Sequence, residues 1–408
     1  MKKLLAVLAT CLLLGTFAST NGNAQDTRVP DHRLLYFPLN TDMVMFDSPS
    51  TRLFLGWQRN TNTLFQIGLD SVSQYFDLHR SGQELIRFGV LTLFTGAGLI
   101  VNQAFSLTAH DESHMEAARA IGASGVSLVR SSNGQEMGIW EFFLEAFNFT
   151  SEPGLYAYSK DNPTLNEQAY VAGEGLDTNM VIADMISRKI NEGAGHITDL
   201  APYMLNKLWG ISYFVETGPT SDASNYMNLL NDRGYGTVTR RNVIFLNAAS
   251  CLLSGGFLNL MRGTYNFIVE GDSMVKPLEL RIGEVSVFWP ELTTWLNSDN
   301  TSLLVSVDAA WRDIVLMRVG IDSPILGNTR VNPELTFGVR VKIHRLSLGM
   351  ELTSQFVRLP FFMGSTEFDL SDMFSVGVEG YYGERNTMRE QREYPLGPGA
   401  VGFVKAKL

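Results

Sequence analysis

The sequence of residues 85–122 is LIRFGVLTLFTGAGLIVNQAFSLTAHDESHMEAARAIG, a long apolar stretch that ends in two histidines. A nearly uncharged run, residues 88–107, leads directly into the HDESH segment at residues 110–114. Helix residues four apart lie on one face, so the imidazoles of His110 and His114 can converge on one metal ion. The apolar run before them predicts that this face lies deep in a protein core or in a membrane.

Two acidic residues lie between the histidines. Glu112, two positions after His110, is rotated by about 200° on a helix and points to the other face. Asp111 occupies the position at which the H-E-x-x-H arrangement keeps its general base, and a carboxylate there can take a proton from a water held by the metal. Asp is shorter than Glu by one methylene group, so this position departs from the usual pattern.

The spacing extends beyond the histidines. Four residues recur at intervals of four: His110, His114, Ala118 and Gly122. After a Gly-rich apolar helix, this pattern resembles the zinc helix of integral-membrane metallopeptidases of the site-2-protease type, over residues 88–122. The resemblance implies a zinc ion and a third ligand from an Asn/Pro/Asp-Gly motif in a later apolar segment. The corresponding residues 247–259 contain Asn and Gly but no Asp, and the export signal and β-rich C-terminus described below are foreign to that family.

A catalytic zinc ion needs a third protein ligand and an open position. Glu174 is the first candidate, because it opens the next amphipathic segment and a Glu from a downstream helix resembles the gluzincin arrangement. His196 and Asp177 are the next candidates, while Glu141 and Glu145 are candidates for orienting the imidazoles. The alternative interpretations are a solvated helix face for the two histidines, a helix-start carboxylate for Glu174 and a loop position for His196.

The composition of the 408-residue chain limits its function. It is 45% hydrophobic and 18% charged, below the charge of about 25% that is usual for soluble domains. Its net charge of −10, without a Lys/Arg cluster, excludes nucleic acid as a partner. No G-x-S-x-G elbow, phosphate-binding loop or dinucleotide fingerprint occurs in the sequence.

The first 24 residues have the features of a secretory signal peptide. Lys2 and Lys3 precede an apolar run at residues 4–17, and Gly22-Asn23-Ala24 forms a small-x-small cleavage site. Cys251 is the one cysteine after this segment, so no intramolecular disulfide is expected in the exported protein. We interpret Cys251 as a small core residue.

The patterns divide the remaining chain into three parts. Residues 25–70 predict short strands, and residues 71–270 predict a helical domain. The candidate strands are residues 34–37, 43–46, 52–57 and 63–69. The expected helices are residues 85–122, 139–149, 176–190, 200–215 and 243–261. Asp177 or Thr178 is the expected N-cap of the third helix, and the last one suits either a membrane span or close helix packing.

Residues 271–408 form the third part, in which the period changes to two. Apolar residues alternate with polar ones over residues 334–343, and the phase flips after His344-Arg345, as a tight hairpin produces. Further runs occur at residues 313–321, 374–382 and 401–408. Runs of about nine to eleven residues match membrane-spanning strands, although a soluble antiparallel sheet would also alternate.

These observations predict an α+β protein, with an apolar helical bundle followed by an antiparallel β-region in the form of a membrane β-barrel or barrel-like sheet. We expect it in the envelope of a Gram-negative-type bacterium, in the outer membrane rather than the soluble periplasm, in contact with membrane lipid. The first functional hypothesis is a zinc-dependent hydrolase that acts on a protein or peptide, with His110 and His114 as ligands, Glu174 or His196 as the third ligand and Asp111 as the base. The second is a non-enzymatic outer-membrane barrel with a helical plug or accessory segment.

Overall fold

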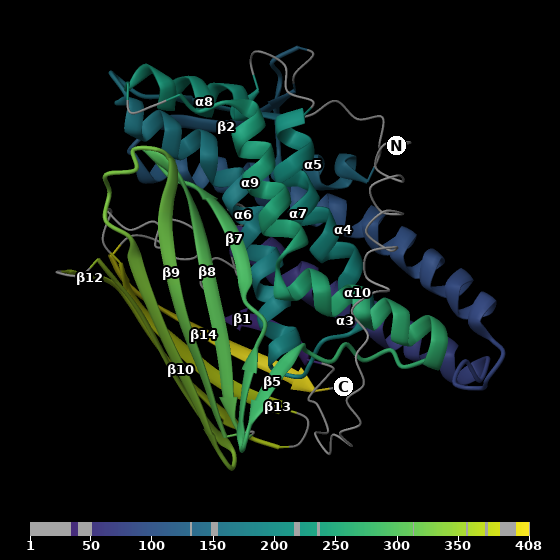
Figure 1. Ribbon diagram of the computed structural model, residues 1–408. Coiled ribbons are helices and arrows are strands. Elements are labelled where there is room, and N and C mark those ends of the chain that lie inside the picture. The colour runs from purple at the N-terminus through teal and green to yellow at the C-terminus, as the bar shows by residue number, and fades with distance from the viewer. Residues whose placement is uncertain are drawn as a thin grey trace.

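The computed structural model describes residues 34–39, 51–130, 133–147, 154–215, 221–234, 237–312, 314–355, 358–371, 374–383 and 397–407. The predicted signal peptide and the predicted strand at residues 43–46 lie outside these residues. Helices dominate the first part and an antiparallel sheet the last, so the α+β prediction is confirmed. Figure 1 shows the helices gathered on one side of the curved sheet.

Eight α-helices and a short 3-10 helix are described. They are α3 (Thr51–Tyr75), α4 (Glu84–Ala120), α5 (Ile139–Ala146), α6 (Leu165–Asn191), η2 (Ile197–Asp199), α7 (Leu200–Val215), α8 (Asp222–Asp232), α9 (Arg240–Leu252) and α10 (Gly255–Glu270). Helix α6 lies at the centre, in contact with α4, α7, α8 and α10 and with strand β7 of the sheet. The largest apolar cluster joins α6, α7 and α10 with parts of α3 and α4.

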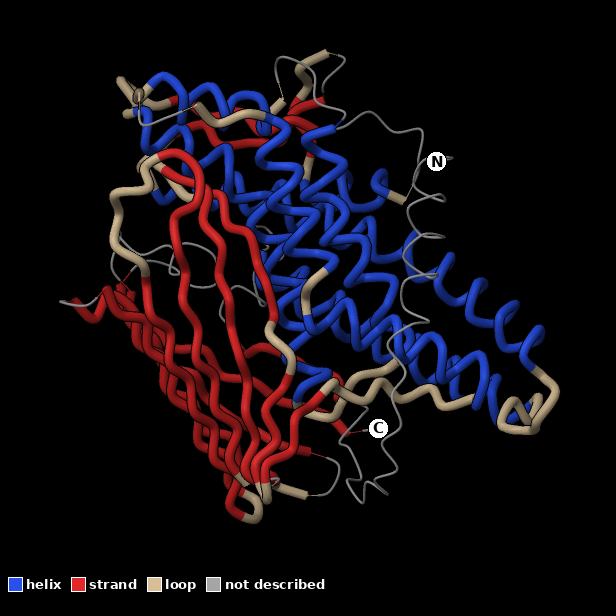
Figure 2. The backbone as a smooth tube through the Cα atoms, viewed as in Figure 1, coloured by secondary structure: helices blue, strands red, loops and turns tan. Residues whose placement is uncertain are grey.

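The main sheet has eleven described strands, and every neighbouring pair is antiparallel. They are β1 (Leu34–Leu39), β5 (Glu279–Ile282), β6 (Val285–Phe288), β7 (Glu291–Leu296), β8 (Asn300–Trp311), β9 (Val315–Gly327), β10 (Glu334–Ile343), β11 (Leu346–Gln355), β12 (Arg358–Asp369), β13 (Phe374–Gly383) and β14 (Gly397–Lys407). Their order is β1-β14-β13-β12-β11-β10-β9-β8-β6-β5, with β7 also paired to β8. Among the described strands this path is open, and the tube in Figure 2 shows the sheet curling around the helices. A closed barrel stays a prediction.

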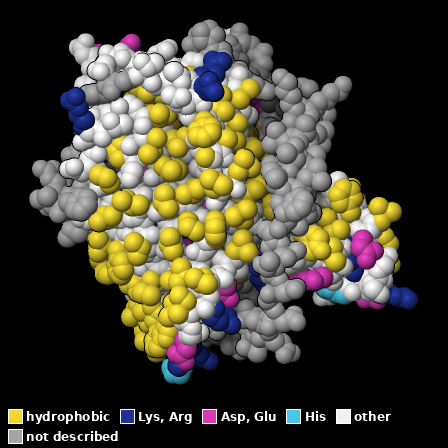
Figure 3. Space-filling model, in the orientation of Figure 1, with side chains coloured by type: hydrophobic (Ala, Val, Ile, Leu, Met, Phe, Trp, Pro, Cys, Tyr) yellow, Lys and Arg dark blue, Asp and Glu magenta, His cyan; other side chains and the backbone are white. Residues whose placement is uncertain are grey.

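The burial pattern of the sheet is the reverse of the pattern in a soluble protein. Along β10, Glu334 and Thr336 are buried at 1% and 4% exposure, while Leu335 and Phe337 between them are 38% and 39% exposed. Other outward-facing apolar residues on the neighbouring strands are also exposed: Val319, Ile321, Leu348, Phe368 and Val378. In Figure 3, hydrophobic side chains form a broad surface where Figure 1 draws the strands of the sheet. Along the first half of β10, the polar side of the strand therefore faces inward.

The inner face of the sheet binds α6 through buried charged groups. The Arg318 guanidinium on β9 contacts Asp308 on β8 at 2.6 Å and Asp184 on α6 at 3.1 Å. Arg188, also on α6, pairs with Asp184 at 2.8 Å and with Glu351 on β11 at 3.3 Å. Paired buried charges fix the orientation of packed elements because an unpaired one would be costly. This network fastens the helical part to the sheet.

The prediction of strands over residues 25–70 is right for β1 and wrong for residues 52–57 and 63–69, which belong to α3. The buried side of α3 is spaced as a helix but is rich in polar residues: Phe54, Gln58, Asn62, Gln66, Leu69 and Ser73. Gln58 donates to Asn102 and to Ser106 on α4, each at 3.0 Å. Hydrophobic periodicity misses such a helix because amides occupy its core positions.

Three further boundaries differ from the predictions. Helix α6 begins at Leu165, where Thr164 and Glu167 form a capping box, so neither Asp177 nor Thr178 is its N-cap. The apolar residues 243–261 fall in two helices, α9 and α10, which meet at an angle of 50°. A small sheet of β2 (Ser124–Arg130), β3 (Glu136–Met137) and β4 (Gly154–Ser159) lies within the part predicted to be helical.

Other boundaries are confirmed. Helix α4 ends just before Gly122, whose φ of +79° suits glycine, and α7 covers the predicted residues 200–215. The β10–β11 hairpin pairs Ile343 with Leu346, which leaves His344 and Arg345 as the turn. Cys251 is a buried member of the apolar core.

Candidate metal centre

His110 and His114 lie on the last third of α4 and face α6. Both are buried, at 3% and 0% exposure, and their rings are 4.8 Å apart between centroids. Their Nε2 atoms are 3.2 Å apart, so the two imidazoles present the same nitrogen to one point. The predicted convergence of these residues on one face is therefore present in the structure.

Gly175 on α6 makes room for this arrangement. A Cβ atom at this position would lie within 2.6 Å of Nε2 of His110, and closer still to Nε2 of His114. A glycine inside a helix costs about 1 kcal/mol relative to alanine. Only a residue without a side chain leaves the space beside both nitrogens open.

A chain of amides fixes the proton on His110. The carbonyl of Pro202 can only accept, and it accepts from Nδ2 of Asn206 at 2.7 Å. Oδ1 of Asn206 then accepts from Nδ2 of Asn179 at 2.7 Å, which directs Oδ1 of Asn179 toward Nδ1 of His110 at 2.9 Å. Nδ1 of His110 must therefore donate, and Nε2 carries the lone pair.

His114 is held in the same tautomer. Its Nδ1 contacts the backbone carbonyl of Val171, which can only accept a hydrogen bond. Burial, and then the neighbouring imidazole of His114, lowers the pKa of His110 from 6.5 to about 4. Burial also lowers the pKa of His114. Both rings are neutral at pH 7, so two lone pairs face each other across 3.2 Å.

Asp222 completes the group from the first turn of α8. Its Oδ2 lies 3.6 Å from Nε2 of His114, and its side chain is 24% exposed. The hydroxyl of Tyr156 donates to Oδ1 and that of Tyr213 to Oδ2, each at 2.8 Å. Burial acts to raise the pKa of Asp222, but the imidazoles and the two tyrosine hydroxyls outweigh it and lower the pKa. The carboxylate is thus ionised and oriented.

These three residues offer the types of ligand that zinc prefers, and the two histidine nitrogens also have a suitable spacing. Two nitrogens, each about 2.0–2.1 Å from one tetrahedral zinc ion, lie about 3.3 Å apart. The observed 3.2 Å fits this value, and one ligand atom from each of His110, His114 and Asp222 lies within 4.8 Å of the others. Each imidazole also has the hydrogen-bonded Nδ1 that is usual for a histidine ligand.

Asp111 is buried beside this group, at 7% exposure. Burial, followed by the carboxylates of Asp222 and Glu112, raises the pKa of Asp111 well above its usual value. Asp111 can accept a proton only in its ionised form, which a cation bound beside it would favour. Its role as a base stays a prediction.

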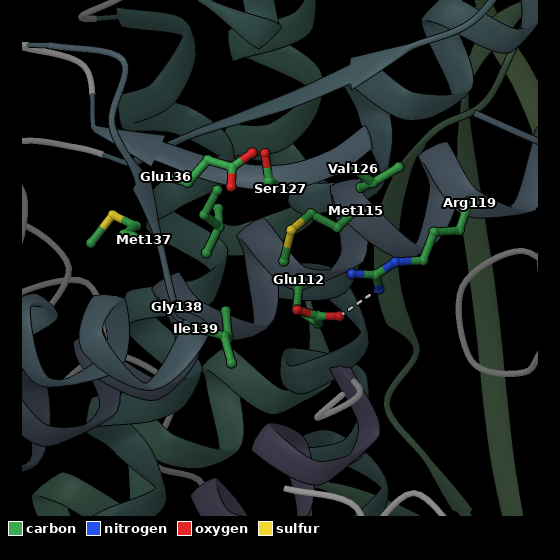
Figure 4. Close-up of a pocket in the computed structure, with 10 residues that line it drawn as sticks. Glu112, Met115, Arg119, Val126, Ser127, Glu136, Met137, Gly138 and Ile139 are labelled. Carbon is green, nitrogen blue, oxygen red and sulfur yellow. Dashed lines mark hydrogen bonds and ion pairs between the residues drawn. The ribbon is translucent and has the colours of Figure 1, made fainter. Parts of the chain in front are cut away.

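Glu112 points to the other side of α4, as its position in the helix predicts. It does not face the histidine pair, and its carboxylate instead pairs with the Arg119 guanidinium at 2.8 Å. Figure 4 shows this pair beside a separate cavity of about 370 Å³, between α4 and strands β2 and β3. Met115 and Met137 also line that cavity.

The other predicted ligands lie elsewhere among the described residues. His196 contacts Thr198 at 2.9 Å and Asp70 at 3.2 Å, next to η2, and it is not part of the histidine group. Glu174 is buried next to Gly175, but it is not among the three described residues that could hold a metal ion together. Oδ1 of Asp177 accepts from the backbone nitrogen of Leu296 at 2.7 Å, and thereby holds the end of β7.

One further expectation is corrected by the structure. Glu141 and Glu145 bind Arg130 at 2.7 Å and 2.5 Å, so they do not orient the imidazoles. Asn247, in the apolar segment where the resemblance places a third ligand, lies near Gly210 of α7. The sequence does not single out Asp222, because it is remote from His114 in the chain. Its one local signal is the helix start at Ser221-Asp222, and such helix starts are common.

Comparisons with known proteins do not place the chain in a family. No family model and no curated protein matches the chain. Among solved structures, the chain is similar to the outer membrane phospholipase A from Escherichia coli, with 9% identity and a TM-score of 0.25. This match covers 33% of the chain and about half, 56%, of that protein. A similarity of this degree does not assign a fold or an activity.

Proposed function

We propose that this protein is a metal-dependent hydrolase of the cell envelope that acts on proteins or peptides. Zinc would be held by His110, His114 and Asp222. The observation that carries the proposal is the pair of Nε2 lone pairs, fixed 3.2 Å apart by two hydrogen-bonded Nδ1 atoms and faced by an ionised carboxylate. Neutral, buried acceptors that face one another are repulsive unless a cation lies between them.

The number of ligands favours catalysis over a purely structural role. Structural zinc sites have four protein ligands, whereas catalytic sites have three and keep a position open. The described group offers two histidines and one aspartate. When bound, zinc would supply Lewis acidity and lower the pKa of a water molecule.

The protein's own residues have separable roles in this proposal. Asp111 would accept the proton, in the ionised form that a neighbouring cation favours. Tyr156 and Tyr213 keep the Asp222 carboxylate in place. The partly exposed Asp222 lies on the side from which a substrate would approach, because both histidines are buried.

The proposal is tested with fluorogenic peptides and unfolded casein as substrates for the purified full-length protein. We expect hydrolysis that a chelator abolishes and that Asp111→Asn removes while bound metal is retained. Glu112→Gln is the matched control, since this neighbouring carboxylate faces the opposite side of α4. Hydrolysis that survives both chelation and Asp111→Asn would refute the assignment.

We also propose that the outer face of the sheet contacts membrane lipid, in the outer membrane. The supporting observation is the inverted burial of strands such as β10, with apolar residues outside and polar residues against α6. Strands β8 to β14 have ten to thirteen residues, long enough to cross a membrane at a tilt.

A non-enzymatic outer-membrane protein is the second candidate. The deep burial of His110 and His114, and the ion pairs that fasten α6 to the sheet, favour a metal that only stabilises the helical part. In that case the protein would bind zinc with full stoichiometry and hydrolyse no substrate. Asp111→Asn would then have no effect beyond stability.

A further inference from the structure

Helices α3 and α4 form a hairpin whose far half is apolar on its outer surface. Over residues 85–100 of α4, the exposed residues are all uncharged: Leu85, Ile86, Phe88, Gly89, Thr92, Leu93, Gly96, Ala97 and Ile100. Tyr75 and Phe76 at the end of α3 are exposed at 84% and 54%. Of the described helices, α4 alone is by itself long and apolar enough to cross a membrane; α9 and α10 qualify only as one bent pair. Figure 1 shows the hairpin projecting from the helical part.

The one charged side chain within residues 85–100 of α4 is turned inward. Arg87 is 1% exposed, and its guanidinium donates to four backbone carbonyls. Two belong to the connection after α3, at Leu78 and Arg80, and two belong to the end of α10, at Ile268 and Val269. Helix ends leave carbonyls without partners, and side chains, water or ligands can satisfy them. In lipid they must be satisfied by the protein, as Arg87 does here.

The exposed hydroxyl groups on the hairpin are also satisfied internally. Oγ1 of Thr92 donates to the carbonyl of Phe88 at 2.8 Å, and Oγ of Ser71 donates to the carbonyl of Ile67 at 2.7 Å. Such bonds to the preceding turn remove donors that would otherwise need water. The outer surface of α4 over residues 85–100 therefore presents little that must be hydrated.

Charged residues mark the tip of the hairpin. Asp77, His79, Arg80 and Glu84 are exposed there, just before the apolar part of α4. The sixteen residues from Leu85 to Ile100 span about 24 Å at 1.5 Å per residue, close to the apolar band of about 25 Å on outer-membrane barrels. Figure 3 shows charged side chains gathered both at the lower end of the sheet and at the end of the hairpin.

We propose that the α3–α4 hairpin lies in the lipid bilayer beside the sheet, with its charged tip at one membrane surface. This inference rests on the membrane location proposed above. Helix α3 contacts β1, the strand at one end of the sheet path, so the hairpin continues the lipid-facing surface and covers that edge. The metal-binding part of the same helix begins ten residues after Ile100, about 15 Å beyond the apolar band.

The outer surface of the hairpin is suited to contact with lipid rather than with a protein. A protein partner would use polar and charged groups at the rim of its contact, whereas the outer surface over residues 85–100 has no charge. The inward Arg87 and the internally bonded Thr92 and Ser71 leave few groups on this surface that need water.

Single-cysteine variants labelled with an environment-sensitive fluorophore test the inference. Cys251 is buried and is replaced by Ser in the background. Leu93→Cys reports on the hairpin, Phe337→Cys on the sheet, Arg80→Cys on the tip and Asp232→Cys on the exposed end of α8. The full-length protein is reconstituted in phosphatidylethanolamine/phosphatidylglycerol vesicles with and without brominated acyl chains. We expect brominated lipid to quench the labels at residues 93 and 337 at least twofold, and to leave the labels at residues 80 and 232 unchanged.

Failure of the hairpin inference and failure of the proposed membrane location give different results in this experiment. Quenching at residue 337 without quenching at residue 93 overturns the hairpin inference and leaves the membrane location of the sheet intact. Absence of quenching at both positions refutes the membrane location as well. A third outcome is that quenching at residue 93 disappears when two copies of the protein are crosslinked through this surface. That result would assign the surface to self-association and would also overturn the inference.

Discussion

Gly175 sets how closely α6 approaches the two imidazoles. Its lack of a side chain is unfavourable within a helix, and the structure gives a reason for it in the space beside the Nε2 atoms of His110 and His114. The sequence shows the histidine spacing, but it does not show which residue of another helix faces it. That information arises only when α6 packs against α4.

Gly175→Ala tests this role of residue 175. The added methyl group would occupy the space shared by both nitrogens, so we expect zinc binding to be lost in a protein that still folds. Zinc content per purified chain is the measurement. Gly96→Ala, on α4 with no atom within 4 Å of its Cβ, is the control and should keep the metal. Full zinc binding by Gly175→Ala would contradict the proposed position of the ion.

Asn179→Leu removes the acceptor that fixes the His110 tautomer. Loss of such a partner weakens metal binding by about 10–100-fold, and we expect zinc affinity to fall by that amount in a chelator competition. Asn231→Leu is the control for general destabilisation, because the Asn231 amide holds the backbone of Val238 at a different place. Equal affinity in the two variants would show that the amide chain does not act on His110.

At the scale of the elements, prediction succeeded where apolar side chains all lie on one face and polar side chains on the other. Strand β10 alternates strictly, and its hairpin with β11 was predictable to the residue. Helix α3 was mistaken for strands because glutamine and asparagine occupy its buried face. The start of α6 was missed because Thr164 and Glu167 precede a segment without a clear apolar stripe.

The capping box of α6 makes a pH-dependent contribution to stability. Hydrogen bonds from Lys160 and from Thr164 lower the pKa of Glu167 from 4.5 to about 2. Because the folded pKa is the lower one, this stabilisation is fully present above pH 4.5 and is lost as the pH falls toward 2. We expect Glu167→Gln to melt at a lower temperature than the wild type at pH 7, with the gap closing at pH 2–3. A gap that stays constant over this range would contradict the role of the carboxylate.

At the scale of the whole molecule, the inverted sheet is the main feature that the sequence left open. Alternation alone suits a soluble sheet and a membrane sheet equally, since it does not show which face is covered. The structure covers the polar face with α6, through Asp184, Arg188 and their partners on the strands. The apolar face is the one that remains exposed.

A charge on the outer face should therefore impair insertion. Phe337→Lys places an ammonium group on a surface proposed to contact lipid, at a cost of about 2–4 kcal/mol if it lies near the bilayer midplane. We expect a lower urea midpoint for folding into vesicles. Leu165→Lys is the control, because this exposed apolar residue lies at the start of α6, away from the sheet surface. Equal midpoints for the two variants would indicate that the sheet does not enter the bilayer.

The zinc content of three purified full-length proteins tests the central claim, that His110, His114 and Asp222 form a metal centre. Wild-type protein and His196→Ala should each contain about one zinc ion per chain, since His196 binds Asp70 and Thr198 instead. Asp222→Asn should contain little or none, because its amide replaces the carboxylate that faces the imidazoles. Loss of zinc in His196→Ala with retention in Asp222→Asn, or a wild-type protein that binds no metal, would contradict the account.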